Sequence, residues 1–494
     1  MKRIIVTALL LASFFTYAQQ KNTLLDGKFW KDKPSVQLVK EEITKGNNPA
    51  EANGGNNDVV SVAILGDASN DVIKYLIDLP GNSIDKTTHD GRLYIHWAAN
   101  KGNVELVKYL IEKGSDVNRT DDKGATPLAF AAGNGQTNIE IFELFFKAGI
   151  DPKAKYKDGA NLMLQSIATD KDLKVAEYLI SKGLSLKDTD DLGRTTFDYA
   201  ARLGNVELLK TLASKGVKAT GNALVIASQG SRGFSNTLDT YKYLVETVKL
   251  DPKSKGENGE NVLHNLLKKA DQEAIIDYFL SKNVDINAVD NKGNSAFMGL
   301  AGTKNLALAE KLIGKVKDIN AVNSKGESAL YAAIQNGSSE MVDYLISKGA
   351  KTSIVGKEGN IAHALIASYK KPRPNETNED FVKKIEILKN NGVDFAKAQK
   401  DGSSLYHAAI IKNDIQLFKL LEGLNIDINA QDKDGLTVLH KAAMMSKDDV
   451  ILKHLVSLGA KTDIKTEFDE TAYDLASDNE YLKEHNVNVD FLKF

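Results

Sequence analysis

Histidines are the side chains of this sequence best suited to chemistry, because imidazole can act as a general acid, a general base or a metal ligand near neutral pH. Residues 89–114 read HDGRLYIHWAANKGNVELVKYLIEKG and place His96 directly before Trp97. The stretch begins with a polar turn that contains Asp-Gly and ends with Gly, so it is compatible with a binding pocket or with a structural unit. A recurrence of the same spacing would favour the structural interpretation.

The spacing does recur. Four histidines stand five residues after a glycine of a polar turn, and these are His96, His264, His407 and His440. A fifth, His363, stands one residue early. Because a catalytic residue has no reason to return in every unit, we expect these histidines to belong to a scaffold. Trp97 is then expected to pack between units and not to hold a cofactor.

Motifs of known catalytic and metal sites were sought and are absent. The chain contains no H-E-x-x-H, no G-x-S-x-G and no complete G-x-G-x-x-G. It has no cysteine, which excludes disulfides, thiolate metal sites and cysteine nucleophiles. We therefore expect no enzyme activity, no cofactor and no bound metal.

The elements that surround the histidines repeat as well. A polar turn precedes a short apolar helix, and a second helix follows with one buried face, as in Val104, Val107, Leu110 and Ile111. Gly114 and Gly349 then stand where a left-handed residue ends that helix. The turn positions recur mostly every 33 to 35 residues, at Asn56, Gly91, Gly124, Gly159, Gly193, Gly259, Gly293, Gly326, Gly359, Gly402, Gly435 and Asp469.

This period and layout resemble the ankyrin repeat, whose T-P-L-H-x-A signature is matched most closely by TPLAFA (126–131) and TVLHKA (437–442). The resemblance covers nearly all of residues 24–494. It implies an all-α solenoid of helix–turn–helix units with short β-turn fingers, about thirteen units long. It also implies that the signature histidine hydrogen-bonds between neighbouring turns.

The sequence predicts five segments. Only about four residues, in place of the usual ten, separate Gly216 from the next first helix, so a finger is shortened or missing there. This break separates two runs of repeats, between two capping units. The predicted segments are 1–18, a signal peptide; 19–56, an N-terminal capping partial repeat; 57–218, a first run; 219–465, a second run; and 466–494, a C-terminal capping repeat.

The first eighteen residues are typical of an export signal. Lys2 and Arg3 precede an apolar run from 4 to 15, and Thr16-Tyr17-Ala18 ends it. We expect cleavage before Gln19 and an exported protein, either periplasmic or secreted. No later run is long enough to span a bilayer, so we expect no membrane insertion after signal removal. The chain looks like exported bacterial ankyrin repeat proteins.

Candidate partner contacts follow from the resemblance, which assigns them to turn tips and to the exposed ends of first helices. Four of these positions are apolar, namely Ile411, Leu436, Met444 and Met445, and an exposed apolar patch favours a partner site. The alternative is that the C-terminal cap folds over them. The predicted contact residues are Arg92, Asn100, Lys101, Arg194, Arg202, Leu203, Ile411, Leu436, Met444 and Met445.

The function favoured by the sequence is an exported, non-catalytic scaffold that binds another protein on its concave face. A net charge of −2 gives no electrostatic reason to expect nucleic acid. We expect a monomer. A secreted effector that binds a host or competitor protein is the alternative, and an enzyme without a recognisable motif is the third possibility.

Overall fold

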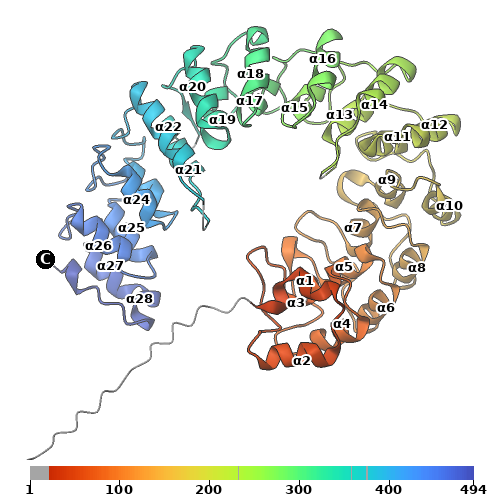
Figure 1. The fold of residues 1–494 in the computed structure, drawn as a ribbon, viewed down its shortest axis with the longest axis horizontal. Coiled ribbons are helices and arrows are strands. Elements are labelled where there is room, and N and C mark those ends of the chain that lie inside the picture. Colours follow the sequence, from red (N-terminus) through yellow and green to blue (C-terminus); the bar gives the residue numbers. More distant parts are fainter. Residues whose placement is uncertain (1–21, 232, 358, 374–375, 494) are drawn as a thin grey trace, which may run out of the picture. The chain divides into compact units, whose positions relative to one another are not determined.

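The computed structural model describes residues 22–231, 233–357, 359–373 and 376–493. The predicted signal peptide therefore lies outside the described residues. The chain divides into two compact units, residues 1–220 and 221–494. In each unit the helices form successive antiparallel pairs, with the first helices in one row and the second helices in another (Figure 1). We call the surface made by the first helices and their preceding fingers the first-helix face.

The first unit contains six such pairs among its described residues. Its first helices contact one another in chain order, as do several of its second helices. The pairs are α1 (Gly27–Lys31) with α2 (Val36–Thr44), α3 (Val59–Leu65) with α4 (Asn70–Ile77), α5 (Tyr94–Lys101) with α6 (Val104–Glu112), α7 (Pro127–Gly133) with α8 (Ile139–Lys147), α9 (Leu162–Ser166) with α10 (Lys174–Ser181), and α11 (Thr196–Ala200) with α12 (Val206–Ser214).

The second unit continues the same arrangement. A π-helical turn, Tyr243–Thr247, extends α14. One finger contains two short antiparallel strands of two residues each, β1 (Val355–Gly356) and β2 (Gly359–Asn360). The pairs are α13 (Asn222–Gln229) with α14 (Leu238–Lys242), α15 (Val262–Leu266) with α16 (Glu273–Ser281), α17 (Ala296–Ala301) with α18 (Leu306–Leu312), α19 (Ala329–Asn336) with α20 (Ser339–Ser347), α21 (Ile361–Ser368) with α22 (Glu379–Asn390), α23 (Leu405–Ile410) with α24 (Ile415–Leu421), α25 (Val438–Met445) with α26 (Val450–Ser457), and α27 (Ala472–Asp478) with α28 (Glu480–Glu484).

Short polar side chains start the helices and left-handed residues end the turns. Thr126 caps α7 by accepting a hydrogen bond from the Ala129 amide, and Pro127 follows at the first helical position, where its fixed φ is favourable. All twelve predicted turn positions have a positive φ, between 56° and 106°. Glycine, asparagine and aspartate tolerate that conformation best, which is why only these residues occur there.

In each unit the core is an apolar layer between the two rows of helices. Ala98 and Ala99 of α5 are fully buried, and the small side chains let α5 pack closely against α3 and α7. Fingers of adjacent repeats are joined through their backbones, since the Asp122 amide donates to the Asp90 carbonyl over 2.9 Å. Each repeat is thus held by its neighbours at both the helices and the fingers.

Candidate protein-binding surface

The four signature histidines have both ring nitrogens in structural hydrogen bonds. In each, Nδ1 accepts the backbone N–H of the residue that caps the helix, so Nε2 carries the proton and donates to a carbonyl of the next repeat. The acceptors are the carbonyls of Ala125, Asn294, Leu436 and Ile464, at 2.9–3.3 Å. This is the role that the sequence predicts for them.

Burial keeps these rings neutral. It lowers the pKa of His96 to about 4 and also lowers the pKa of His264, His407 and His440, because a charged ring loses hydration inside the stack. His363, one residue out of step, differs: its Nδ1 lies 3.2 Å from Oδ1 of Asn360, and its buried Nε2 has no hydrogen-bond partner among the described residues.

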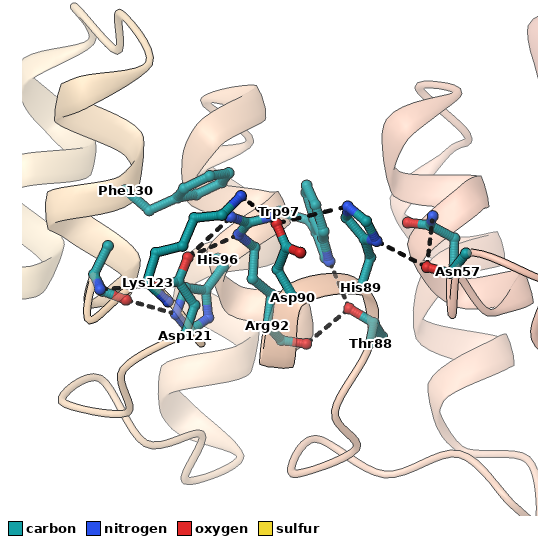
Figure 2. Close-up of polar contacts among 12 residues, drawn as sticks. Asn57, Thr88, His89, Asp90, Arg92, His96, Trp97, Asp121, Lys123 and Phe130 are labelled. Carbon is teal, nitrogen blue, oxygen red and sulfur yellow. Dashed lines mark hydrogen bonds and ion pairs between the residues drawn. The ribbon is translucent and has the colours of Figure 1, made fainter. Parts of the chain in front are cut away.

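Arg92, predicted as a partner contact at a turn tip, is instead a buried clamp between fingers. Its side chain bonds Asp121 through Nε and through a terminal nitrogen, both at 3.0 Å, and its other terminal nitrogen lies 3.1 Å from Asp90 (Figure 2). The guanidinium carbon lies 4.2 Å from the ring centre of Phe130 and 5.1 Å from that of Trp97. Only 5% of the residue is exposed, so the prediction that Arg92 contacts a partner is wrong.

The same arrangement recurs at Arg194. Its side chain bonds the carboxylate of Asp190 in its own finger and lies 2.9 Å from Asp158 in the preceding one, and it covers the ring of Tyr199. The side chain is only 16% exposed, so Arg194 too is mainly a finger clamp. The missed signal was the aspartate that stands three residues before Gly124 and again before Gly193.

The other predicted contacts of the first unit lie at the ends of first helices. Asn100, Lys101 and Leu203 are partly buried and Arg202 is exposed. Lys101 is engaged within the unit, because its ammonium lies 2.7 Å from Asp67. The first unit therefore presents few uncommitted side chains among the positions that were predicted to bind.

The C-terminal repeats present apolar side chains to solvent. Ile411 is 70% exposed, Met444 43% and Met445 50%, whereas Leu436 is partly buried. At this point the C-terminal cap contacts backbone groups: the Asn479 side-chain amide donates to the carbonyls of Ala443 and Ser446. It leaves the three apolar side chains exposed. The alternative that the cap covers these side chains is therefore wrong for Ile411, Met444 and Met445. We call these three residues the apolar patch.

A groove on the first-helix face of the second unit was not predicted. It has a volume of about 560 Å³ and spans α15, α17 and α19. Six positions after the turn glycine, the groove has Asn265, Gly299 and Ala332, whereas the first unit has Trp97, Phe130, Gln165 and Tyr199, so two of the three side chains here leave open space. The groove is lined in part by Asn265, Lys268, Gly299, Gly302, Ala332 and Gln335.

No helix among the described residues is long and apolar enough to cross a bilayer. Within the same ranges, no three histidine, aspartate or glutamate side chains are grouped so that they could hold a metal ion.

Comparison with known families gives two matching models. One describes ankyrin repeats in three copies and matches residues 60–156 and 297–371. The other describes ankyrin repeats in many copies and matches residues 164–213 and 405–451. Together the matched residues make up more than half of the chain.

Relatives of known name share only segments with this chain. A palmitoyltransferase of Lachancea kluyveri is 30% identical over 150 residues, which are 29% of this chain and 20% of the relative. A probable 26S proteasome regulatory subunit, p28, of Saccharomyces cerevisiae is 26% identical over 187 residues, 36% of this chain and 80% of the relative. The human neurogenic locus notch homolog protein 2 is 27% identical over 152 residues, 30% of this chain and 6% of the relative. These three proteins are eukaryotic, so the expected likeness to exported bacterial proteins gains no support from them.

Proposed function

The chain belongs to the ankyrin repeat proteins, and from this premise we propose that it is a non-catalytic scaffold that holds a partner protein on the first-helix face of its second unit. Ankyrin repeat proteins typically mediate protein–protein interaction and are generally non-catalytic. The fold leaves the partner open, because one repeat architecture serves many unrelated partners. The choice of surface depends on the exposed residues of this chain.

The apolar patch is the observation that carries the proposal. Ile411 follows α23, and Met444 and Met445 end α25, so the patch lies at corresponding ends of neighbouring first helices. Leaving three large apolar side chains in water costs free energy that burial against a partner would recover. Methionine is also flexible and adapts to varied apolar surfaces.

A catalytic role is not proposed, because the side chains best suited to it are already committed. The ring nitrogens of His96, His264, His407 and His440 hold neighbouring repeats together. The palmitoyltransferase shares a segment that is only 20% of its own length, so its activity is not transferred to this chain.

We include export in the proposal because of the sequence of residues 1–18 alone. The charged start, the apolar run and the small residues before Gln19 support a secreted or periplasmic scaffold. Fractionation of cells that produce the full chain tests it. Retention in the periplasm supports the scaffold, appearance in the medium supports the alternative of a secreted effector, and an unprocessed chain inside the cell contradicts export.

Affinity capture with chemical crosslinking tests the binding surface. We compare the wild-type protein with Met444→Glu/Met445→Glu, which places charge in the apolar patch. The control is Val450→Glu on α26, an apolar residue with 49% exposure on the second-helix side. The proposal predicts a partner that is lost with the double variant and retained with the control. A partner retained equally by all three proteins contradicts this surface.

A further inference from the structure

We propose that the groove of the second unit and the lysines along its edge bind an extended acidic segment of a polypeptide. This inference rests on the proposed function, because it narrows the partner class of the first-helix face. It adds the chemistry of the ligand, which neither the repeat family nor the apolar patch specifies.

A row of lysines follows the ends of the first helices in the second unit. The row consists of Lys268, Lys269, Lys304, Lys370 and Lys412. None of these five has a carboxylate within ion-pair distance among the described residues, whereas Lys101 at the corresponding place in the first unit is paired with Asp67. Lys269 and Lys412 donate to the backbone carbonyls of Gln229 and Ala367, which fixes them but leaves their charge uncompensated.

The lysines border three adjoining hollows. A hollow next to Lys269 and Lys304 shares Lys268 with the groove. At its other end, the groove shares Gln335 and Asn336 with a further hollow that reaches Lys370 and Lys412. The track therefore runs across five neighbouring first helices, from α15 to α23. An extended chain fits this shape better than a compact ligand does.

Three acidic side chains line the groove and stay charged, but each is held in its own finger, so acidic residues of a ligand would lie along the lysine edge and not beside the fingers. Glu260 accepts the Asn258 amide at 2.9 Å, and Asp290 accepts the amides of Lys292 and Asn294. Glu327 accepts the side-chain amide of Asn323 at 2.8 Å. These carboxylates stabilise the fingers, while the lysines remain available to a ligand.

The spacing and the groove chemistry fit a polypeptide. Packed helices lie about 10 Å apart. A polyproline II chain has three residues per turn and advances about 3.1 Å per residue, so acidic residues at every third position share one face and return about every 9 Å. Such residues would meet the lysines of neighbouring helices, except at α19, whose end carries Gln335 and Asn336. Asn336 lines the groove, and its side-chain amide can donate to and accept from peptide groups. Nucleic acid is less well matched, because Tyr331 and Tyr369 are buried and leave no aromatic face in these hollows for a base to stack on.

A glycine at the bottom of the groove gives the proposed site a second feature that can be tested without changing its charge. A Cβ added at Gly299 would lie 2.5 Å from Cε of Lys268, so the lysine stem lies directly over this glycine. A leucine at position 299 would displace Lys268 and fill the floor. It should not harm α17, because leucine favours a helix more than glycine does.

Fluorescence anisotropy at low salt tests the proposal with the full chain and labelled synthetic peptides. The probe carries glutamate at every third position in a serine and threonine background, and a matched peptide carries lysine instead. The variant Lys268→Glu/Lys304→Glu reverses two charges of the row. The control Lys389→Glu/Lys419→Glu reverses two exposed charges on the second helices α22 and α24.

We expect binding of the acidic probe, a loss of about tenfold or more in affinity for the Lys268/Lys304 variant and for Gly299→Leu, and little change for the control. Binding should weaken as salt is added. Equal affinity of both double variants, or binding of a single-stranded oligonucleotide in preference to the acidic peptide, would overturn the inference. If the acidic peptide fails to bind while capture still depends on Met444 and Met445, the inference falls and the proposed function stands.

Discussion

Acid should destabilise the first unit through His96 before it titrates most carboxylates. Burial lowers the pKa of His96 to about 4 in the folded chain, whereas an exposed histidine has a pKa near 6.5. Between these values the unfolded chain binds more protons than the folded chain. Stability is therefore fully present above about pH 6.5 and is lost as the pH falls towards 4.

The size of the effect follows from that difference in pKa. At pH 5 the unfolded histidine is almost fully protonated, while the buried one is almost fully neutral. The linkage relation gives a loss of about 2 kcal/mol between pH 7 and pH 5 from this one group. That is a large fraction of the stability of a typical domain.

Urea unfolding followed by tryptophan fluorescence measures this loss where it occurs. Both tryptophans of the chain, Trp30 and Trp97, are buried in the first unit, so their emission reports that unit. His96→Gln should lower stability at pH 7 but remove most of the loss between pH 7 and pH 5. His89→Gln, which removes an exposed imidazole, is the matched control and should keep the wild-type loss. An unchanged loss in His96→Gln would refute the assignment of acid sensitivity to the buried ring.

Three further predictions use the same fluorescence assay. Ala99→Phe should lower the free energy of unfolding by about 1–3 kcal/mol, because Ala99 is fully buried between neighbouring first helices and a larger side chain would not fit. An unchanged unfolding midpoint would mean that these helices are packed more loosely than the burial of Ala99 indicates. Arg92→Met should lower the free energy of unfolding by about 3–5 kcal/mol, because it leaves the buried Asp121 carboxylate without its cation. The double variant Arg92→Met/Asp121→Asn removes that unpaired charge and should recover part of the loss. No recovery would argue against an electrostatic interaction between Arg92 and Asp121. Gly114→Ala should lower the free energy of unfolding by about 1–2 kcal/mol, because Gly114 has a φ of 90° that alanine adopts only with strain. Gly133→Ala, at the helical end of α7, should leave the stability unchanged or raise it. Equal effects of the two substitutions would contradict this conformational explanation.

The periodic parts of the fold could be predicted from the sequence, because their physical requirements restrict residue type. A left-handed turn admits glycine, asparagine or aspartate, and this restriction located all twelve turn positions correctly. The fixed distance of the histidines from the turn indicated a structural position, and the resemblance to the ankyrin signature implied their hydrogen bonds between neighbouring turns. Gly114 and Gly349 also end their helices with a positive φ, as expected.

The surface was harder to predict, because it depends on contacts between repeats. Arg92 and Arg194 follow turn glycines and were expected to point to solvent, but each reaches acids in two neighbouring fingers. The groove depends on a difference in side-chain size between distant repeats, which becomes visible only when Gly299 and Ala332 are aligned with Trp97 and Phe130. The exposure of Met444 and Met445 depended on how the C-terminal cap closes, which periodicity does not determine.

Site-specific photocrosslinking shows whether a partner protein is held on the first-helix face of the second unit. A photoreactive phenylalanine analogue replaces Met444 in one protein and Val450, of similar exposure on α26, in another. We expect a discrete protein adduct from position 444 and none from position 450. Adducts from both positions in equal yield, or from position 450 alone, would contradict this expectation.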